Sequence, residues 1–87
     1  MAEPQLLSFP CEFPIKVLGR TQKGYAQAIV EVVLRHAPDF DPATLEMRPS
    51  RQGNYLSLTL VVRAVSQHQL DALYRELCDH PMVQMVL

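Results

Sequence analysis

The stretch NYLSLTLVVRA, residues 54–64, restricts the fold of this chain more than any other part of the sequence. Apolar side chains alternate along it with mostly polar ones, which is the pattern of a β-strand with one buried face and one partly exposed face. The apolar phase holds Leu56, Leu58, Leu60, Val62 and Ala64. The opposite phase holds Tyr55, Ser57, Thr59, Val61 and Arg63. The preceding residues, SRQGN, are typical of a hairpin loop, so we expect antiparallel pairing with a shorter strand before them.

Three weaker strand patterns accompany it, over residues 13–19, 44–48 and 82–87. In the first two, we expect the buried face to carry Ile15, Val17, Leu45 and Met47. Pro49 has no N–H to donate to a ladder, which predicts that the second of these strands lies at a sheet edge. In the final strand the same alternation predicts Val83, Met85 and Leu87 facing inward and Gln84 facing outward.

Two segments have helical periodicity. The first is expected to begin with Thr21 as its cap and to run to about residue 37. Its apolar stripe holds Tyr25, Ala28, Ile29, Val32, Val33 and His36. The second begins with a capping box, in which Ser66 caps the helix and Gln69 reaches back. It should bury Leu70, Leu73, Tyr74 and Leu77, with an Asp71–Arg75 ion pair on its outer side.

The resulting order of strand, helix, strand, strand, helix, strand predicts an α+β fold, the ferredoxin-like βαββαβ sandwich. We expect a four-stranded antiparallel sheet with both helices on one face. The crossover rule places the first and third strands in the middle, where we expect them to be parallel, with the second and fourth at the edges. Residues 13–87 would form this single domain, preceded by an extended lead-in over residues 1–12.

Composition narrows the class of protein. A chain of 87 residues with 48% hydrophobic residues can form one two-layer core without disulfides or metal. Its longest apolar run, residues 58–62, is too short to cross a membrane. Cys11 and Cys78 have no framework spacing and there is no signal-peptide pattern, so we expect reduced thiols and a cytoplasmic protein.

Four phrases of the sequence resemble one known family. They are EFPIKVLG (12–19), VVLRHAP (32–38), RPSRQGNYLSLT (48–59) and PMVQMVL (81–87), in this order. Together they are similar to the YbeD-like family of small, uncharacterised bacterial proteins. The resemblance implies a fold similar to the ACT regulatory domains of amino-acid metabolism. The family has no assigned activity, cofactor or catalytic residue, so the resemblance implies no site.

A small-ligand site is one alternative for function. In ACT domains, which the family resembles, the loop between the first strand and the first helix helps to bind amino acids. Here that loop offers two cations, a hydroxyl and the N–H groups of a helix start, which suit a carboxylate or phosphate. The candidate residues are Arg20, Thr21, Lys23 and Gly24. The simpler interpretation is a solvated loop between two glycines.

Protein interaction is the interpretation that we favour from the sequence. The final strand has neither a charge nor a proline, although edge strands usually carry such protection, so another chain or residues 1–12 would cover it. The uncovered sheet face should mix apolar and cationic side chains and suit self-association or a partner protein. The candidate residues, including the hairpin tip, are Leu18, Arg51, Tyr55, Val61, Arg63, Met82 and Val86.

Other functions have weaker support. A formal charge of −1 and one aromatic residue, Tyr55, on the outward phase of the long strand argue against a nucleic-acid platform. No Cys–His spacing predicts a metal site or an activated thiol, and His36 reads as a helix-end histidine. We therefore expect no enzyme, no metal and no cofactor, and a regulatory or interaction module that acts by binding.

Overall fold

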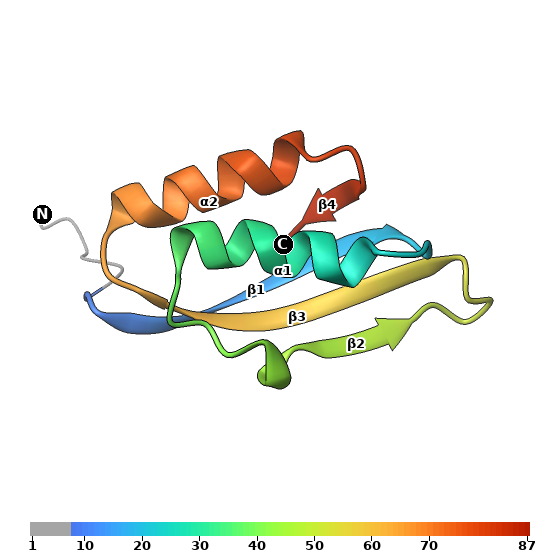
Figure 1. Ribbon diagram of the computed structural model, residues 1–87, viewed down its shortest axis with the longest axis horizontal. Helices are drawn as coiled ribbons and strands as arrows, with labels where there is room; N and C mark the ends of the chain where they lie inside the picture. Colours follow the sequence, from blue (N-terminus) through green and yellow to red (C-terminus); the bar gives the residue numbers. More distant parts are fainter. Residues whose placement is uncertain (1–7) are drawn as a thin grey trace, which may run out of the picture.

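The computed structural model describes residues 8–87 and confirms the predicted order of elements (Figure 1). The elements are β1 (Cys11–Arg20), α1 (Tyr25–His36), a short 3-10 helix (Pro42–Thr44), β2 (Glu46–Pro49), β3 (Tyr55–Ala64), α2 (Gln67–Asp79) and β4 (Val83–Val86). The sheet order is β2-β3-β1-β4, and both helices lie on one face of it. The ferredoxin-like fold is therefore confirmed, with β1 and β3 central as expected.

Two expectations about β1 are corrected. The pairing of β1 with β3 is antiparallel and not parallel. Each crossover skips one strand, so the strand that runs parallel to β1 is β2, which is not next to β1 in the sheet. The strand also starts earlier than predicted, since Cys11 pairs with Ala64 and Glu12 with Arg63. The last two residues of the expected lead-in thus belong to the sheet, and residues 1–7 lie outside the described part of the chain.

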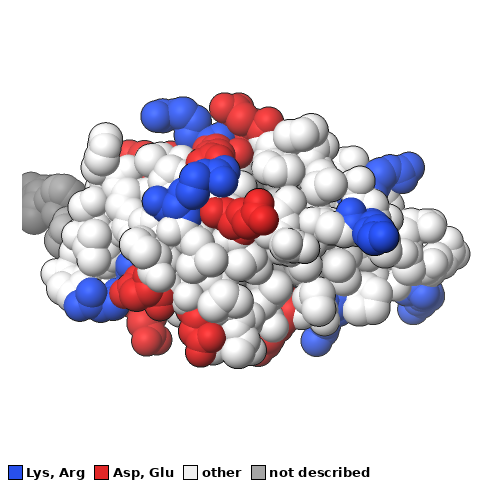
Figure 2. Space-filling model, viewed as in Figure 1, with Lys and Arg blue, Asp and Glu red and all other residues white. Residues whose placement is uncertain are grey.

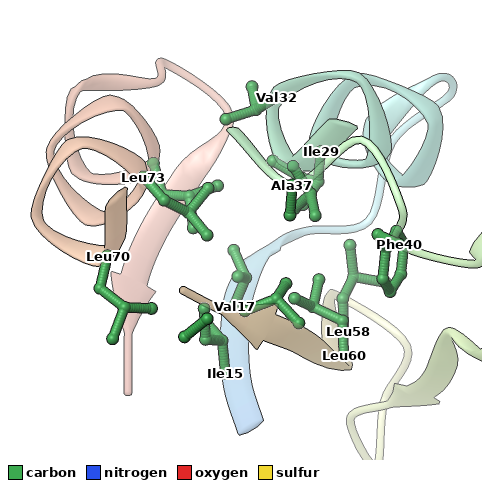
Figure 3. Packing of buried hydrophobic residues seen from close by; sticks show 14 of the residues in the cluster. Ile15, Val17, Ile29, Val32, Ala37, Phe40, Leu58, Leu60, Leu70 and Leu73 are labelled. Atoms are coloured by element: carbon green, nitrogen blue, oxygen red, sulfur yellow. The ribbon is translucent and has the colours of Figure 1, made fainter. Parts of the chain in front are cut away.

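The core lies between the helices and the inner face of β1 and β3, as Figure 3 shows. The apolar phase of β3 is buried as predicted, with Leu58, Leu60, Val62 and Ala64 at most 1% exposed. The predicted helix stripes supply the other side, with Tyr25, Ile29, Val32, Val33, Leu70, Leu73 and Leu77 all buried. No charged or polar residue is buried among residues 8–87. Apolar burial is therefore the main stabilising term of this domain.

The two helices begin differently. Thr21 does not cap α1: its N–H donates to the carbonyl of Asn54, 2.9 Å away, which keeps it in line with β1. The helix instead starts after Gly24, whose φ of 81° requires a glycine-like conformation. At α2 the Ser66 cap is confirmed, because Ser66 Oγ accepts a bond from the Gln69 N–H at 3.0 Å. The Gln69 side chain reaches back to the N–H of Val65.

Gly19 marks a close contact between the sheet and α1. A Cβ at this position would lie 2.4 Å from the carbonyl oxygen of Met82 and 2.7 Å from the Tyr25 ring. The ring of Tyr25 fills this space, and its hydroxyl donates to the carbonyl of Val17 at 3.3 Å. Burial raises the pKa of Tyr25 to about 12. Only glycine leaves room here for the first turn of α1.

The predicted phase of the final strand is correct at Val83 and Gln84 and wrong from Met85 onward. Val17 pairs with Val86 and Leu18 with Met85, but Gly19 pairs with Val83, so a β-bulge interrupts the alternation. Val83 and Val86 therefore both pack against the core. Met85 and Leu87, which were expected inside, are 50% and 66% exposed.

Two smaller expectations also fail. Met47 has the register of an inner-face residue, opposite Leu58, but is 58% exposed because β2 lies beyond the cover of the helices. The Asp71–Arg75 ion pair does not form; Asp71 instead accepts a bond from Gln67 Nε2. β2 is an edge strand, as Pro49 predicted.

Candidate interaction surface

The face of the sheet opposite the helices is uncovered by any helix of residues 8–87 (Figure 1), and we call it the open face. Strand register places outward-facing side chains from all four strands on it. They are Glu12, Pro14, Lys16, Leu18, Arg20, Glu46, Arg48, Tyr55, Ser57, Thr59, Val61, Arg63, Met85 and Leu87.

The side of the open face near β4 is apolar. Leu18 pairs with Met85, and the exchange of backbone hydrogen bonds between Lys16 and Leu87 places Leu87 next along β4. Leu18, Met85 and Leu87 form what we call the apolar strip. Val61, which is 44% exposed, lies further along the face opposite Pro14. Exposed apolar side chains of this kind suit contact with a protein better than contact with water.

The side near β2 is polar and hollow. A depression of about 600 Å³ is lined by Lys16, Glu46, Met47, Arg48, Ser57 and Thr59. The short side chains of Ser57 and Thr59 lie on the central strand β3, while the charged side chains come from the neighbouring strands β1 and β2. The open face thus carries an apolar strip beside a polar hollow.

The outer edge of β4, which pairs with no other strand of residues 8–87, adjoins the apolar strip. Leu87 exchanges both of its hydrogen bonds with Lys16, at 2.8 and 3.1 Å. In an antiparallel ladder the preceding residue, Val86, then directs its N–H and C=O away from β1. The strand has no charge and no proline that would block the approach of another strand.

A basic end of the molecule lies where the loop after β1 meets the β2–β3 hairpin. Its exposed cations are Lys16, Arg20, Lys23, Arg48 and Arg51. Figure 2 shows Lys and Arg, and no Asp or Glu, at the right-hand end of the visible face. The guanidinium of Arg20 lies over the ring of Tyr55, 5.6 Å from its centroid. A pocket of about 380 Å³ at this end is lined by Arg20, Thr21, Gln22, Gly53 and Asn54.

The structure brings some of the candidate residues together. Of the predicted ligand loop, Arg20 and Thr21 line the pocket, whereas Lys23 and Gly24 do not. Leu18, Tyr55, Val61 and Arg63 lie on the open face as expected, and Arg51 lies in the hairpin turn.

Met82 and Val86, which were expected on the open face, pack against the core instead, and Met85 and Leu87 take their place. The bulge opposite Gly19 accounts for Met85, Val86 and Leu87, because it adds one residue to β4 and reverses the side on which the following residues lie, whereas Met82 precedes β4 and lies in the turn after α2. Nothing in the regular alternation of residues 82–87 indicates this bulge. The exposure of Met85 and Leu87 could therefore not be predicted from the sequence.

The reactive side chains of the described chain are engaged in structural contacts or are isolated. His36 Nε2 lies 2.7 Å from Glu76 Oε1, and Glu76 also pairs with Arg35, which together hold the pKa of Glu76 below its usual value. His80 Nδ1 accepts the N–H of Met82 at 3.1 Å. Cys11 and Cys78 are free thiols. Residues 8–87 hold no group of three potential metal ligands, and no helix in this range is long and apolar enough to span a bilayer.

Comparisons with known proteins give one family and one fold. The family model described as "Protein of unknown function (DUF493)" matches residues 4–87. A UPF0250 protein of Nitrosomonas europaea is 53% identical over 87 residues, which is all of both chains. A UPF0250 protein of Bordetella pertussis is 56% identical over 85 residues, covering 98% of this chain and 93% of that one.

Solved structures share the fold at low identity. The solution structure of protein HP0495 from Helicobacter pylori matches with a TM-score of 0.77 at 15% identity, over 98% of this chain and 88% of that one. The ACT domain from GTP pyrophosphokinase of Chlorobium tepidum matches with a TM-score of 0.65 at 18% identity, over 87% of this chain and 84% of that one. At these identities the likeness concerns the fold alone.

Proposed function

The chain belongs to the DUF493 family, and we propose that it is a non-catalytic binding module that recognises another protein, or a second copy of itself, through its open face. The family match and the UPF0250 relatives confirm the YbeD-like resemblance, and the ACT domain confirms the ACT-like fold. The family description and the names of the relatives give no activity, and the likeness to the ACT domain concerns the fold alone. The proposal therefore rests on the surfaces of this chain.

One observation carries the proposal: apolar side chains are exposed on a sheet face that no described helix covers. Met85 and Leu87 are half or more exposed, and they lie beside the outer edge of β4. A partner could bury the apolar strip and add a strand at Val86 in the same contact. Met85 and Leu87 lie at the β4 side of the sheet and outside the core, so a partner can cover them without rearranging the core.

Sedimentation of the domain at tens of micromolar tests whether the partner is a second copy. Self-association would raise the average mass above 9.9 kDa as the concentration increases. Met85→Lys and Val61→Lys should then return the protein to the mass of a monomer, because each places a charge within the buried contact. Val65→Lys is the matched control, since Val65 is 53% exposed but lies beyond the end of β3.

If the domain is a monomer, a photo-crosslinking residue in place of Met85 identifies a different partner in the native cell. Crosslinks at Met85 that are absent when the same group replaces Val65 would support the proposal. A monomer that gives no position-specific crosslink at Met85 would refute it.

The pocket at the basic end supports a second candidate function, the sensing of a small anion such as an amino acid or a phosphate compound. Arg20 and Thr21 provide a guanidinium and a hydroxyl on one side, and Asn54 provides an amide on the other. Titration of amino acids and phosphate compounds should shift the backbone amides of residues 19–25 in NMR spectra. Unchanged amides at saturating concentrations would exclude these ligands.

A further inference from the structure

We propose that the basic end, formed by Lys16, Arg20, Lys23, Arg48 and Arg51, binds an acidic segment of a partner protein. This inference rests on the proposed function and names the chemistry of the partner. It places the acidic segment on the open face and the adjoining loops, next to the apolar strip.

Charge is unevenly distributed along the chain. The five cations of the basic end are more than half of its eight Lys and Arg residues. Neither residues 13–30 nor residues 47–70 contain an Asp or a Glu. Pairing of β1 with β3, and of β3 with β2, brings these two acid-free segments together, and Glu46, which lies just outside them, is level with Lys16 across Thr59 and lines the same hollow. A formal charge of −1 for the whole chain therefore conceals a strongly positive end.

No ion pair within the described chain neutralises this end. In residues 8–87, the ion pairs are those of Glu76 with Arg35 and His36, which link α1 to α2. All five cations of the basic end are exposed. Like charges held close together repel one another, and an anionic partner would relieve that repulsion.

The segments that carry these cations are held in place before any partner binds. The Thr21 N–H donates to the carbonyl of Asn54 at 2.9 Å, which ties the loop after β1 to the hairpin. Within the hairpin, Ser50 accepts the N–H of Tyr55 through its hydroxyl and donates its own N–H to the carbonyl of Tyr55. The Tyr55 ring in turn supports Arg20. A backbone that is fixed before binding, together with the supported Arg20 side chain, loses less entropy on binding, which favours recognition.

The extent of the basic end suits a chain segment better than a free small anion. Lys16 and Arg20 lie on the same face of β1, four residues apart, which corresponds to a distance of about 13 Å. The pocket beside Arg20 and the hollow beside Lys16 and Arg48 lie along this distance. An extended peptide with carboxylates at intervals can contact both places, whereas one amino acid or phosphate group cannot.

The side chains here favour protein carboxylates over nucleic acid. Single-stranded nucleic acids are usually bound by aromatic rings on which bases stack. Tyr55 is the one aromatic residue in residues 16–24 and 47–55, and Arg20 occupies a face of its ring. The arginines can pair with carboxylates through two parallel hydrogen bonds.

The test is a titration of the ¹⁵N-labelled domain with a decaglutamate peptide, followed by amide shifts. We expect the shifts to concentrate in residues 16–24 and 48–55, and to shrink as salt is added. Arg51→Glu should weaken binding by about threefold to tenfold. Arg75→Glu is the matched control, because Arg75 is also exposed but lies on α2, and it should leave the affinity within about twofold.

Three outcomes would overturn the inference. One is the absence of shifts at low salt, and another is equal weakening by Arg51→Glu and Arg75→Glu. The third is a single-stranded RNA decamer that shifts the same amides at lower concentration than the peptide. Free glutamate at the same carboxylate concentration should shift these amides less than the peptide does. Since Met85→Lys and Val61→Lys leave the five cations intact, failure here is distinguishable from failure of the proposed function.

Discussion

The two faces of the sheet are formed by the same strands but differ in the burial and the chemistry of their side chains. On the inner face, Ile15, Val17, Leu58 and Leu60 are at most 1% exposed and belong to the apolar core cluster. On the open face, the alternating positions of β1 and β3 mix apolar, hydroxyl and charged side chains, and most of them are exposed. Adjacent residues such as Leu60 and Val61 therefore differ in environment although both are aliphatic.

This difference shows which side chains the fold requires and which positions can vary without loss of the fold. Burial of the inner face provides most of the free energy of folding, so side chains there are restricted to close-packed apolar groups. The open face contributes little to that free energy, so its composition is free to serve binding. An apolar strip and a basic end on such a face are thus informative about partners.

The largest expected effect comes from the centre of the inner face. Leu58→Ala should reduce the free energy of unfolding by about 3–4 kcal/mol, because it removes a fully buried side chain and leaves a cavity. Val61→Ala, three residues further along β3 but on the open face, should change it by less than about 1 kcal/mol. Urea denaturation of both variants measures the contrast. Similar losses for the two would show that the open face is also a packed surface.

Gly19→Ala tests the inner face where α1 and β4 meet β1. The added methyl group would collide with the Met82 carbonyl and the Tyr25 ring, so we expect a loss of about 2–3 kcal/mol. Gly24→Ala is the comparison variant: nothing lies within 4 Å of its Cβ, and only its φ of 81° is unfavourable, at a cost of about 1 kcal/mol. Thermal denaturation monitored by circular dichroism ranks the two. A milder effect at Gly19 than at Gly24 would contradict the close contact.

The sequence predicted the inner face better than the open one, for a physical reason. Burial imposes periodicity, so the stripes of β3, α1 and α2 can be read from Leu58, Ile29 and Leu73 and their neighbours. The β-bulge opposite Gly19 depends on the close approach of Met82 and Tyr25, which are distant in sequence, and no local pattern indicates it.

The helices cover only part of the sheet, and the sequence does not show which strand positions they leave exposed. Met47 has the correct phase for burial, but the helices do not extend over β2. At the basic end, the contact of Thr21 with Asn54 joins two segments that are distant in the sequence. Their nearest cations, Lys23 and Arg48, have 24 residues between them. The total charge of the chain gave no indication that they would gather.

Substitutions in β4 sharpen the comparison at neighbouring positions. Val86→Lys should cost about 1–3 kcal/mol, because Val86 packs against the core, whereas Met85→Lys should cost less than about 1 kcal/mol. Urea midpoints for the two variants decide the phase of the strand. The original alternation would predict the reverse order, with Met85→Lys the more damaging.

The smallest expected effect concerns the charged contact between the helices, which lies outside both faces of the sheet. Arg35 and His36 lower the pKa of Glu76 below 4.5, so ionised Glu76 stabilises the fold above about pH 4.5, and this contribution is lost as the pH falls through the lowered pKa. Glu76 and Arg35 are partly exposed, so water screens the pair, and Glu76→Gln should lower the Tm by only about 1–4 °C at pH 7.

The difference between Glu76→Gln and the wild-type protein should disappear once the pH has fallen below the lowered pKa of Glu76, because the protonated carboxyl is uncharged like the amide. Glu46→Gln is the control, because Glu46 has no ion-pair partner among residues 8–87, and it should leave the Tm within about 1 °C at either pH. A loss at Glu76 comparable to that of Leu58→Ala would mean that charge, and not apolar packing on the inner face, attaches the helices to each other. A small loss confined to neutral pH would support packing as the dominant contribution.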